Sequence, residues 1–259
     1  MRRVLGIGLV AMLLYGQGAV GSSRDESAAS LTAGQIFEKM LGHYASLASY
    51  QDQGSITTTI GGTIIAIGFE TRMARPDFYR IEWDQLSKLA YSTEDSGMQG
   101  AWSFESGDYL QTPSGLQKQY SRDVAFANMA SASSEGVAMV PRIFFGVHGI
   151  GEPGAIIDLA RLPDDKVGNI ECFQITGETA AGGTNTFWVG KRDFLIRQIR
   201  TDFGPGAMQS AFTGATKGQV EPPFKLNGFS SIEIYTNVVA NKRFSRRDFV
   251  PSFSLSGPY

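Results

Sequence analysis

The 259-residue sequence contains few of the residues from which metal sites and disulfides are built. It has one cysteine, Cys172, and two histidines, His43 and His148. A structural metal site of thiolate and imidazole ligands needs about four such groups, and a single cysteine excludes an internal disulfide. We therefore expect no metal and no other cofactor.

Charge is also scarce. Asp, Glu, Lys and Arg make up 19% of the chain, and the formal net charge is −2. A protein that binds nucleic acid needs a basic face that neutralises phosphates, so we expect no nucleic-acid partner. The hydrophobic residues make up 42% of the chain and the aromatic residues 11%. This composition excludes a disordered chain and predicts a globular domain with a sizeable core.

The N-terminus has the layout of a secretory signal peptide. Arg2 and Arg3 precede an apolar run at residues 4–14, and small residues follow at 19–21. The run is too short to cross a bilayer comfortably, which takes about 20 residues. We expect a signal peptide over residues 1–21, a flexible lead-in over 22–31 and a single domain over 32–259. The mature protein would be soluble and periplasmic or otherwise exported; an uncleaved membrane anchor is the alternative.

Motifs of known catalytic chemistry are weak or missing. Residues 149–154 match G-x-G-x-x-G, and Glu171 follows at the distance expected of a ribose-binding acid. Pro153, however, occupies the place where a helix N-terminus would offer its N–H groups, so we expect a Gly-rich surface loop. The sequence has no G-x-S-x-G elbow, and neither His43 nor His148 lies in a motif.

The remaining candidate catalytic groups favour structural roles. Cys172 lies in a predicted strand and is expected to be a buried, inert thiol. Glu70, Glu82 and Asp84 alternate with Arg72 and Arg80, which predicts cross-strand ion pairs on a solvated face. The sequence thus predicts a protein that is not an enzyme, with a hydrolase of unrecognised site as the least favoured alternative.

Hydrophobic periodicity predicts an α+β fold. Thr32 and Gln35 have capping-box spacing at the start of a helix over residues 32–47. Two further helices are expected at 121–132 and 134–146, the second short or kinked at Pro141. Period-two alternation predicts strands at residues 55–60, 63–73, 78–83, 101–104, 108–111, 169–177, 185–190, 194–203 and 230–238. Residues 155–162 are expected to form a helical turn or a strand, 204–225 a long loop, and 244–253 a last edge strand.

Large apolar residues come from many of these elements. Most would be ordinary core, but a curved antiparallel sheet covered by a few helices can also keep an apolar cavity between the two layers. The candidate ligand-binding residues are Phe69, Tyr79, Ile81, Trp83, Trp102, Phe187 and Ile199 from the strands, and Ile143 and Phe144 from the helical insert.

The order of several short motifs resembles the LolA/LolB-like periplasmic lipoprotein-carrier superfamily and its outer membrane lipoprotein-sorting relatives. The motifs are MLGHY at residues 40–44, MARPDFYRIEW at 73–83, FWVGKRDFLIRQI at 187–199 and the ending at 241–251. The resemblance implies an incomplete antiparallel β-barrel with a helical lid and a concave apolar face that holds acyl chains. It also implies that Arg75 links the barrel to the lid.

These observations together predict an exported protein that binds hydrophobic ligands. The expected partners are a lipid or an acylated lipoprotein and, additionally, an envelope membrane protein. A sensor of envelope stress is the alternative function, because related folds are used in that way.

Overall fold

The computed structural model describes residues 31–86, 97–104, 107–133, 136–147, 156–179, 182–207 and 228–252. All of them belong to the compact unit Leu31–Tyr259. The predicted signal peptide, most of the lead-in, His148, residues 149–154 and most of the loop at 204–225 lie outside the described residues.

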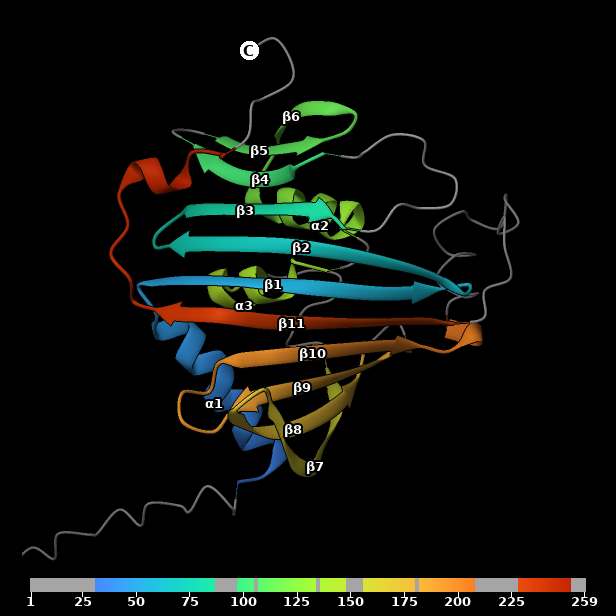
Figure 1. Ribbon diagram of the computed structural model, residues 1–259. Helices are drawn as coiled ribbons and strands as arrows, with labels where there is room; N and C mark the ends of the chain where they lie inside the picture. Colours follow the sequence, from blue (N-terminus) through green and yellow to red (C-terminus); the bar gives the residue numbers. More distant parts are fainter. Residues whose placement is uncertain are drawn as a thin grey trace, which may run out of the picture. The chain divides into compact units, whose positions relative to one another are not determined.

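One antiparallel sheet of eleven strands forms the framework of this unit (Figure 1). The strands are β1 (Ser49–Ile60), β2 (Thr63–Ala74), β3 (Phe78–Gln85), β4 (Gln99–Phe104), β5 (Gly107–Thr112), β6 (Gly115–Gln119), β7 (Ile157–Val167), β8 (Ile170–Glu178), β9 (Thr184–Gly190), β10 (Ile196–Phe203) and β11 (Phe229–Ala240). Their order is β6-β5-β4-β3-β2-β1-β11-β10-β9-β8-β7. The strands nearest the two ends of the sequence thus meet in the middle of the sheet. β6 and β7 form its two edges and do not pair with each other in the described part of the chain, which confirms the predicted α+β fold with an incomplete barrel.

Three helices lie on one face of the sheet (Figure 1). They are α1 (Ala33–Ser46), α2 (Arg122–Ala132) and α3 (Met139–Phe145), and we call them the helical cover. α1 contacts β7 and β8, α2 contacts β4, β5 and β6, and α1 contacts α3. The sheet side beneath them is the covered face, and the opposite side is the outer face.

The predicted helix start at Thr32 is confirmed by its capping box. The Gln35 side chain accepts from the Thr32 backbone N–H at 2.8 Å, and the Thr32 hydroxyl accepts from the Gln35 N–H at 3.2 Å. The helix predicted to be short or kinked at Pro141 is short: α3 has 7 residues, and Pro141 is the third of them. The first turn of a helix does not use the N–H that proline lacks.

Two segments differ from the sequence prediction, and a third decides between its alternatives. Residues 157–167 form edge strand β7, the strand alternative expected at 155–162, whereas β6 was not predicted at all. The segment expected to be a last edge strand instead contains a short 3₁₀ helix, η3 (Arg246–Phe249), which contacts β3 and β4. We call residues 244–252 the strap, since Arg80 and Glu82 on the outer face hydrogen-bond to it.

The hydrophobic core lies between the covered face and the helical cover. The two layers approach closely where the chain enters α3: a Cβ added to Gly136 would lie 2.1 Å from the Cδ1 atom of Ile56. A side chain at this position would therefore displace the end of the Ile56 side chain.

Candidate functional site

Eight of the nine predicted ligand-binding residues lie between the sheet and the helical cover. Side chains of alternate strand residues share one face, and the sheet registers place the strand residues of this group together. Each of the eight side chains is at most 6% exposed. They are Phe69, Tyr79, Ile81, Trp83, Phe187, Ile199, Ile143 and Phe144.

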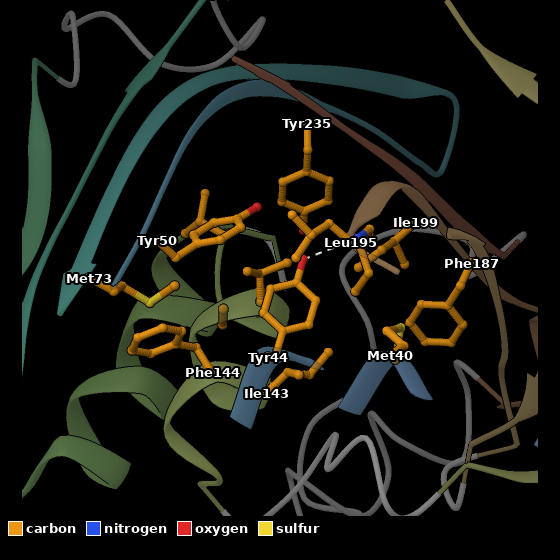
Figure 2. Packing of buried hydrophobic residues seen from close by; sticks show 14 of the residues in the cluster. Met40, Tyr44, Tyr50, Met73, Ile143, Phe144, Phe187, Leu195, Ile199 and Tyr235 are labelled. Atoms are coloured by element: carbon orange, nitrogen blue, oxygen red, sulfur yellow. Dashed lines mark hydrogen bonds between the residues drawn. The ribbon is translucent and has the colours of Figure 1, made fainter. Parts of the chain in front are cut away.

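Aromatic contacts join the two layers. Phe37 of α1 lies 5.9 Å from Phe187 of β9, and Phe126 of α2 lies 5.0 Å from Tyr79 of β3, both measured between ring centroids. Figure 2 shows Phe144 of α3 next to Met73 of β2, and Met40 of α1 beside Phe187 of β9. In the described residues the helices themselves fill the predicted binding face, so a ligand could reach it only if they moved.

Trp102 does not belong to this group. The β3–β4 register pairs Ala101 with Ile81 and Trp102 with Arg80, which places the indole on the outer face. There it stacks on Tyr109, with ring centroids 5.9 Å apart. The strand predicted at 101–104 is confirmed. Because this short strand is buried on both sides, however, its sequence has no apolar–polar alternation that would show which face each residue takes.

Arg75, at the end of β2, connects the sheet to two helices of the cover. Its Nε donates to the backbone oxygen of Leu47 at 3.0 Å, and its Nη2 donates to those of Tyr44 at 3.4 Å and Phe144 at 2.5 Å. The guanidinium carbon also lies 4.7 Å from the centroid of the Phe144 ring. One cation thus satisfies carbonyls at the C-terminal ends of α1 and α3, where helices leave such groups unpaired. This is the position for which the resemblance implies a link between barrel and lid.

The covered face also carries a polar cluster that the sequence analysis missed. Its members are Tyr44, Tyr50, Asp52, Glu233 and Tyr235, and we call them the acidic–tyrosine cluster. Tyr50 donates to Asp52 Oδ2 at 2.8 Å, and Tyr235 donates to Glu233 Oε2. The Tyr44 hydroxyl accepts from the Ile196 N–H at 3.1 Å, and the rings of Tyr44, Tyr50 and Tyr235 converge in Figure 2.

Burial controls the electrostatics of this cluster. Asp52 is completely buried, and burial is the largest influence on the pKa of its carboxyl group, which is raised to about 7. Hydrogen bonds from Tyr50 and Thr71 lower this pKa, but by less than burial raises it. The nearby charge of Glu70 raises it further. Burial also raises the pKa of Tyr44, Tyr50 and Tyr235, which keeps these hydroxyls protonated.

Two buried polar atoms on the covered face have no hydrogen-bond partner among the described residues. They are Asp52 Oδ1 and Trp83 Nε1. Buried polar atoms in native proteins are nearly always paired, so each exception asks for an explanation. A signal for the cluster was present in the sequence: Tyr50-x-Asp52 and Glu233-x-Tyr235 put polar groups on the same strand face as buried apolar neighbours.

The outer face contains ion pairs among the alternating charges, but only one of the pairs named here is a cross-strand pair as predicted. Arg80 of β3 pairs with Glu70 of β2, whereas Arg72 with Glu70 and Arg80 with Glu82 are contacts within one strand. The expectation that this face is solvated is wrong for Arg80 and Glu82, which are 7% and 5% exposed. The strap covers them: Arg80 donates to the Val250 carbonyl, and the Ser252 N–H and hydroxyl donate to Glu82.

The groups considered for catalysis are not brought together. Cys172 is buried on β8, and burial raises the pKa of its thiol, whereas His43 lies on α1. Within the described residues, no group of three or more His, Cys, Asp and Glu side chains could hold a metal ion. No helix in the same residues is long and apolar enough to span a membrane.

Neither a family model nor a curated protein matches this sequence. Solved structures do match. Lipoprotein LppX of Mycobacterium tuberculosis is 12% identical, with 81% of this chain and 95% of that chain covered and a TM-score of 0.43. A LolA superfamily protein of Nitrosomonas europaea is 10% identical, covering 86% of this chain and 99% of its own, with a TM-score of 0.32. In the MucA/MucB complex of Pseudomonas aeruginosa, the matching chain is 7% identical over 85% of this chain and 61% of its own, with a TM-score of 0.42. The solved structures to which this chain is similar thus include a protein of the LolA superfamily.

Proposed function

We propose that this protein is an exported, non-enzymatic carrier that binds a lipid or the acyl chains of a lipoprotein on the covered face of its sheet. The observation that carries the proposal is the pairing of a mostly apolar sheet face with a cover made of three separate helices. Of these, α3 has only 7 residues, and helices this short depend on tertiary contacts for their stability. Such a cover can move without breaking the sheet.

Burial supplies the binding energy in this proposal. Each methylene removed from water contributes about 0.8 kcal/mol, so a long acyl chain can be held without a covalent bond. The chain would replace contacts such as Phe37–Phe187 and Tyr79–Phe126 as the helices lift away. Arg75 holds the ends of α1 and α3 against β2, and its hydrogen bonds favour the closed arrangement.

The test combines ligand detection with a change at Arg75. Native mass spectrometry and solvent extraction of the purified protein should recover a bound lipid, and the delipidated protein should take up a fluorescent fatty acid saturably. Arg75→Ala should speed uptake, because weakening the closed state raises the population of the binding-competent one. Arg75→Lys keeps the charge but not the fork of donors and should fall between the two.

Absence of a copurified lipid together with absence of fatty-acid uptake by all three forms would overturn the proposal. A pull-down that recovers a membrane-anchored regulator from such a lipid-free protein would favour the envelope-stress sensor instead.

A further inference from the structure

Positive charge is concentrated in one short segment of a weakly acidic chain. Four of the 23 Lys and Arg residues, and no Asp or Glu, fall within residues 242–247, although the formal net charge of the chain is −2. We call these six residues the basic segment. Its cations are Lys242, Arg243, Arg246 and Arg247, and all four are exposed. The basic segment thus presents to solvent a charge opposite in sign to that of the whole chain.

Few contacts within the protein use this charge. Arg243, Arg246 and Arg247 have no hydrogen bond or ion pair with any described residue. Lys242 donates to Gln51 Oε1 at 2.8 Å, and an amide oxygen carries no charge that would neutralise the ammonium. Within the described part of the chain, three guanidinium groups are therefore free to bind an anionic surface.

One acidic side chain, Asp248, lies in the strap. Its carboxylate accepts from the Ser245 N–H and hydroxyl at 2.7 and 2.8 Å and lies 3.8 Å from Arg72 of β2. The hydrogen bonds from Ser245 lower the pKa of Asp248 most, and the charges of Arg72 and Lys242 lower it further. Because Asp248 shares its single charge between Arg72 and Lys242, it leaves the arginines of the basic segment uncompensated.

Apolar side chains lie beside these cations. Phe244 is half-buried, and the Lys242 Nζ lies 5.5 Å from the centroid of its ring. Val239, which is opposite Gln51 in the β1–β11 register, is 42% exposed, and Val250 is 45% exposed. Protein surfaces that bind in the interface of an anionic bilayer combine Lys and Arg with aromatic and apolar side chains in this way.

We infer that the basic segment docks the protein on the surface of a membrane that contains anionic phospholipids. A guanidinium group can bind a phosphate through two parallel N–H donors, so each of the three free arginines can take a lipid phosphate. The inference goes beyond the proposed function, because it names the surface at which a carrier would load or release its ligand and not the site that holds the ligand.

The basic segment also lies next to an end of the helical cover. Asn241, the residue that precedes it, accepts from the Ala48 N–H at 2.9 Å. Leu47, the neighbour of Ala48, is held by Arg75 at the end of α1. Figure 1 shows the chain leaving β11 toward η3 at the end of the sheet where α1 lies. Docking would therefore bring the end of α1 to the membrane surface, and a lipid would have a short path between the bilayer and the covered face.

The experiment measures cosedimentation of the purified protein with vesicles of pure phosphatidylcholine and of equal parts phosphatidylcholine and phosphatidylglycerol. We expect binding to the anionic vesicles only, and weaker binding as salt is added, because salt screens exposed charges. Each Lys or Arg close to an anionic surface strengthens binding about fivefold, so Arg243→Gln/Arg246→Gln/Arg247→Gln should weaken it about a hundredfold. Because these three side chains are exposed and have no described partner, this variant should unfold at the same urea concentration as wild type.

A second triple variant, Lys118→Gln/Lys166→Gln/Arg200→Gln, is the matched control. It removes the same number of positive charges from exposed positions on β6, β7 and β10. Its net charge therefore equals that of the basic-segment variant, but it should bind the anionic vesicles nearly as tightly as wild type.

Failure of the wild-type protein to bind anionic vesicles, or equal binding by the two triple variants, overturns the docking surface. Binding to polyglutamate without binding to the vesicles also overturns it and points to an acidic protein as the partner. Fatty-acid uptake in the absence of vesicles tests the carrier function separately and should be unchanged in the basic-segment variant, so either proposal can fail while the other stands.

Discussion

Asp52 shows how a single buried carboxyl group shapes the behaviour of the protein. The groups that act on its pKa are the hydroxyl groups of Tyr50 and Thr71 and the carboxyl group of Glu70. Solvent is excluded and the available donors are neutral, so the neutral form of Asp52 is favoured in the folded state. The folded protein therefore retains a proton at Asp52 over a pH range in which the unfolded chain has released it.

This difference predicts a stability change with a definite sign. The pKa of Asp52 is raised from 3.8 to about 7, so between these values unfolding releases a proton and stability falls as pH rises. Relative to wild type, Asp52→Asn should become more stable by up to about 4 kcal/mol between pH 4 and pH 8, from about 1.4 kcal/mol per pKa unit. Urea unfolding of both proteins at a series of pH values measures the difference.

Asp165→Asn provides a control of opposite sign in the same titration. Hydrogen bonds from Trp188 and the Lys166 N–H lower the pKa of Asp165. The ionised form of Asp165 therefore stabilises the folded protein at pH values above the pKa of Asp165 in the unfolded chain. This stabilisation is lost as the pH falls through the pKa of Asp165 in the folded protein. A pH-independent difference between wild type and Asp52→Asn would mean that Asp52 titrates in the folded protein as it does in the unfolded chain.

The strap is the element whose role was least visible beforehand. Phe249 is 3% exposed and lies 5.5 Å from the rings of both Phe78 and Phe244. η3 is held by its own capping box between Ser245 and Asp248. The strap thus covers the ion pairs of the outer face and is anchored there by the contact of Phe249 with Phe78. The helical cover packs on the opposite face of the sheet.

Removing the aromatic anchor should uncover those ion pairs. We expect Phe249→Ala to lower the free energy of unfolding by about 3 kcal/mol, the usual cost of deleting a buried phenylalanine ring. Val250→Ala, at a neighbouring side chain that is 45% exposed, should cost less than about 0.5 kcal/mol. Denaturant unfolding compares the two variants, and equal costs would mean that the strap does not pack in solution as described.

The secondary structure was predictable where one face of an element is apolar and the other polar. This holds for α1, with its capping box, and for β2, in which Ile67, Phe69 and Met73 alternate with polar residues. It fails for β6, whose run GLQKQ has little apolar content, because that strand forms through pairing with β5. It fails again at residues 244–253, where a strand-like composition folds onto another surface instead of extending the sheet.

The candidate site was predictable only in part, for a related physical reason. Apolar residues with period two, such as Tyr79, Ile81 and Trp83, indicate a shared face. The face of Trp102 depends on its register with Arg80, which no local pattern contains. The acidic–tyrosine cluster arises from α1, β1 and β11. The Tyr-x-Asp and Glu-x-Tyr spacings show polar groups on one face of each strand, but no local pattern shows that the two strands, far apart in the sequence, lie side by side.

At the scale of the whole molecule, the layers should differ in how readily they open. β1 and β11 each have 12 residues and are hydrogen-bonded on both sides, whereas α2 and α3 are short and lie over the sheet. Amide hydrogen exchange should therefore proceed through local opening in α2 and α3, and through global unfolding in β1 and β11. Bound ligand should slow exchange in the helices more than in the sheet. Equal protection of helices and central strands, with or without ligand, would argue against a cover that moves separately.

The central pairing of β1 with β11 also constrains the order in which the chain can fold. Tyr50 is opposite Ala240, and Ile60 is opposite Phe229, so the seam between the two halves of the sheet joins residues from opposite ends of the described chain. Such long-range contacts form late and slowly, because closing the long loop between the two strands costs entropy before their contacts can stabilise the fold. During synthesis β1 to β6 emerge without the strand that completes their inner edge. The chain thus remains incompletely folded until β11 is available, a delay that suits the proposed export, in which the chain crosses a membrane before it folds.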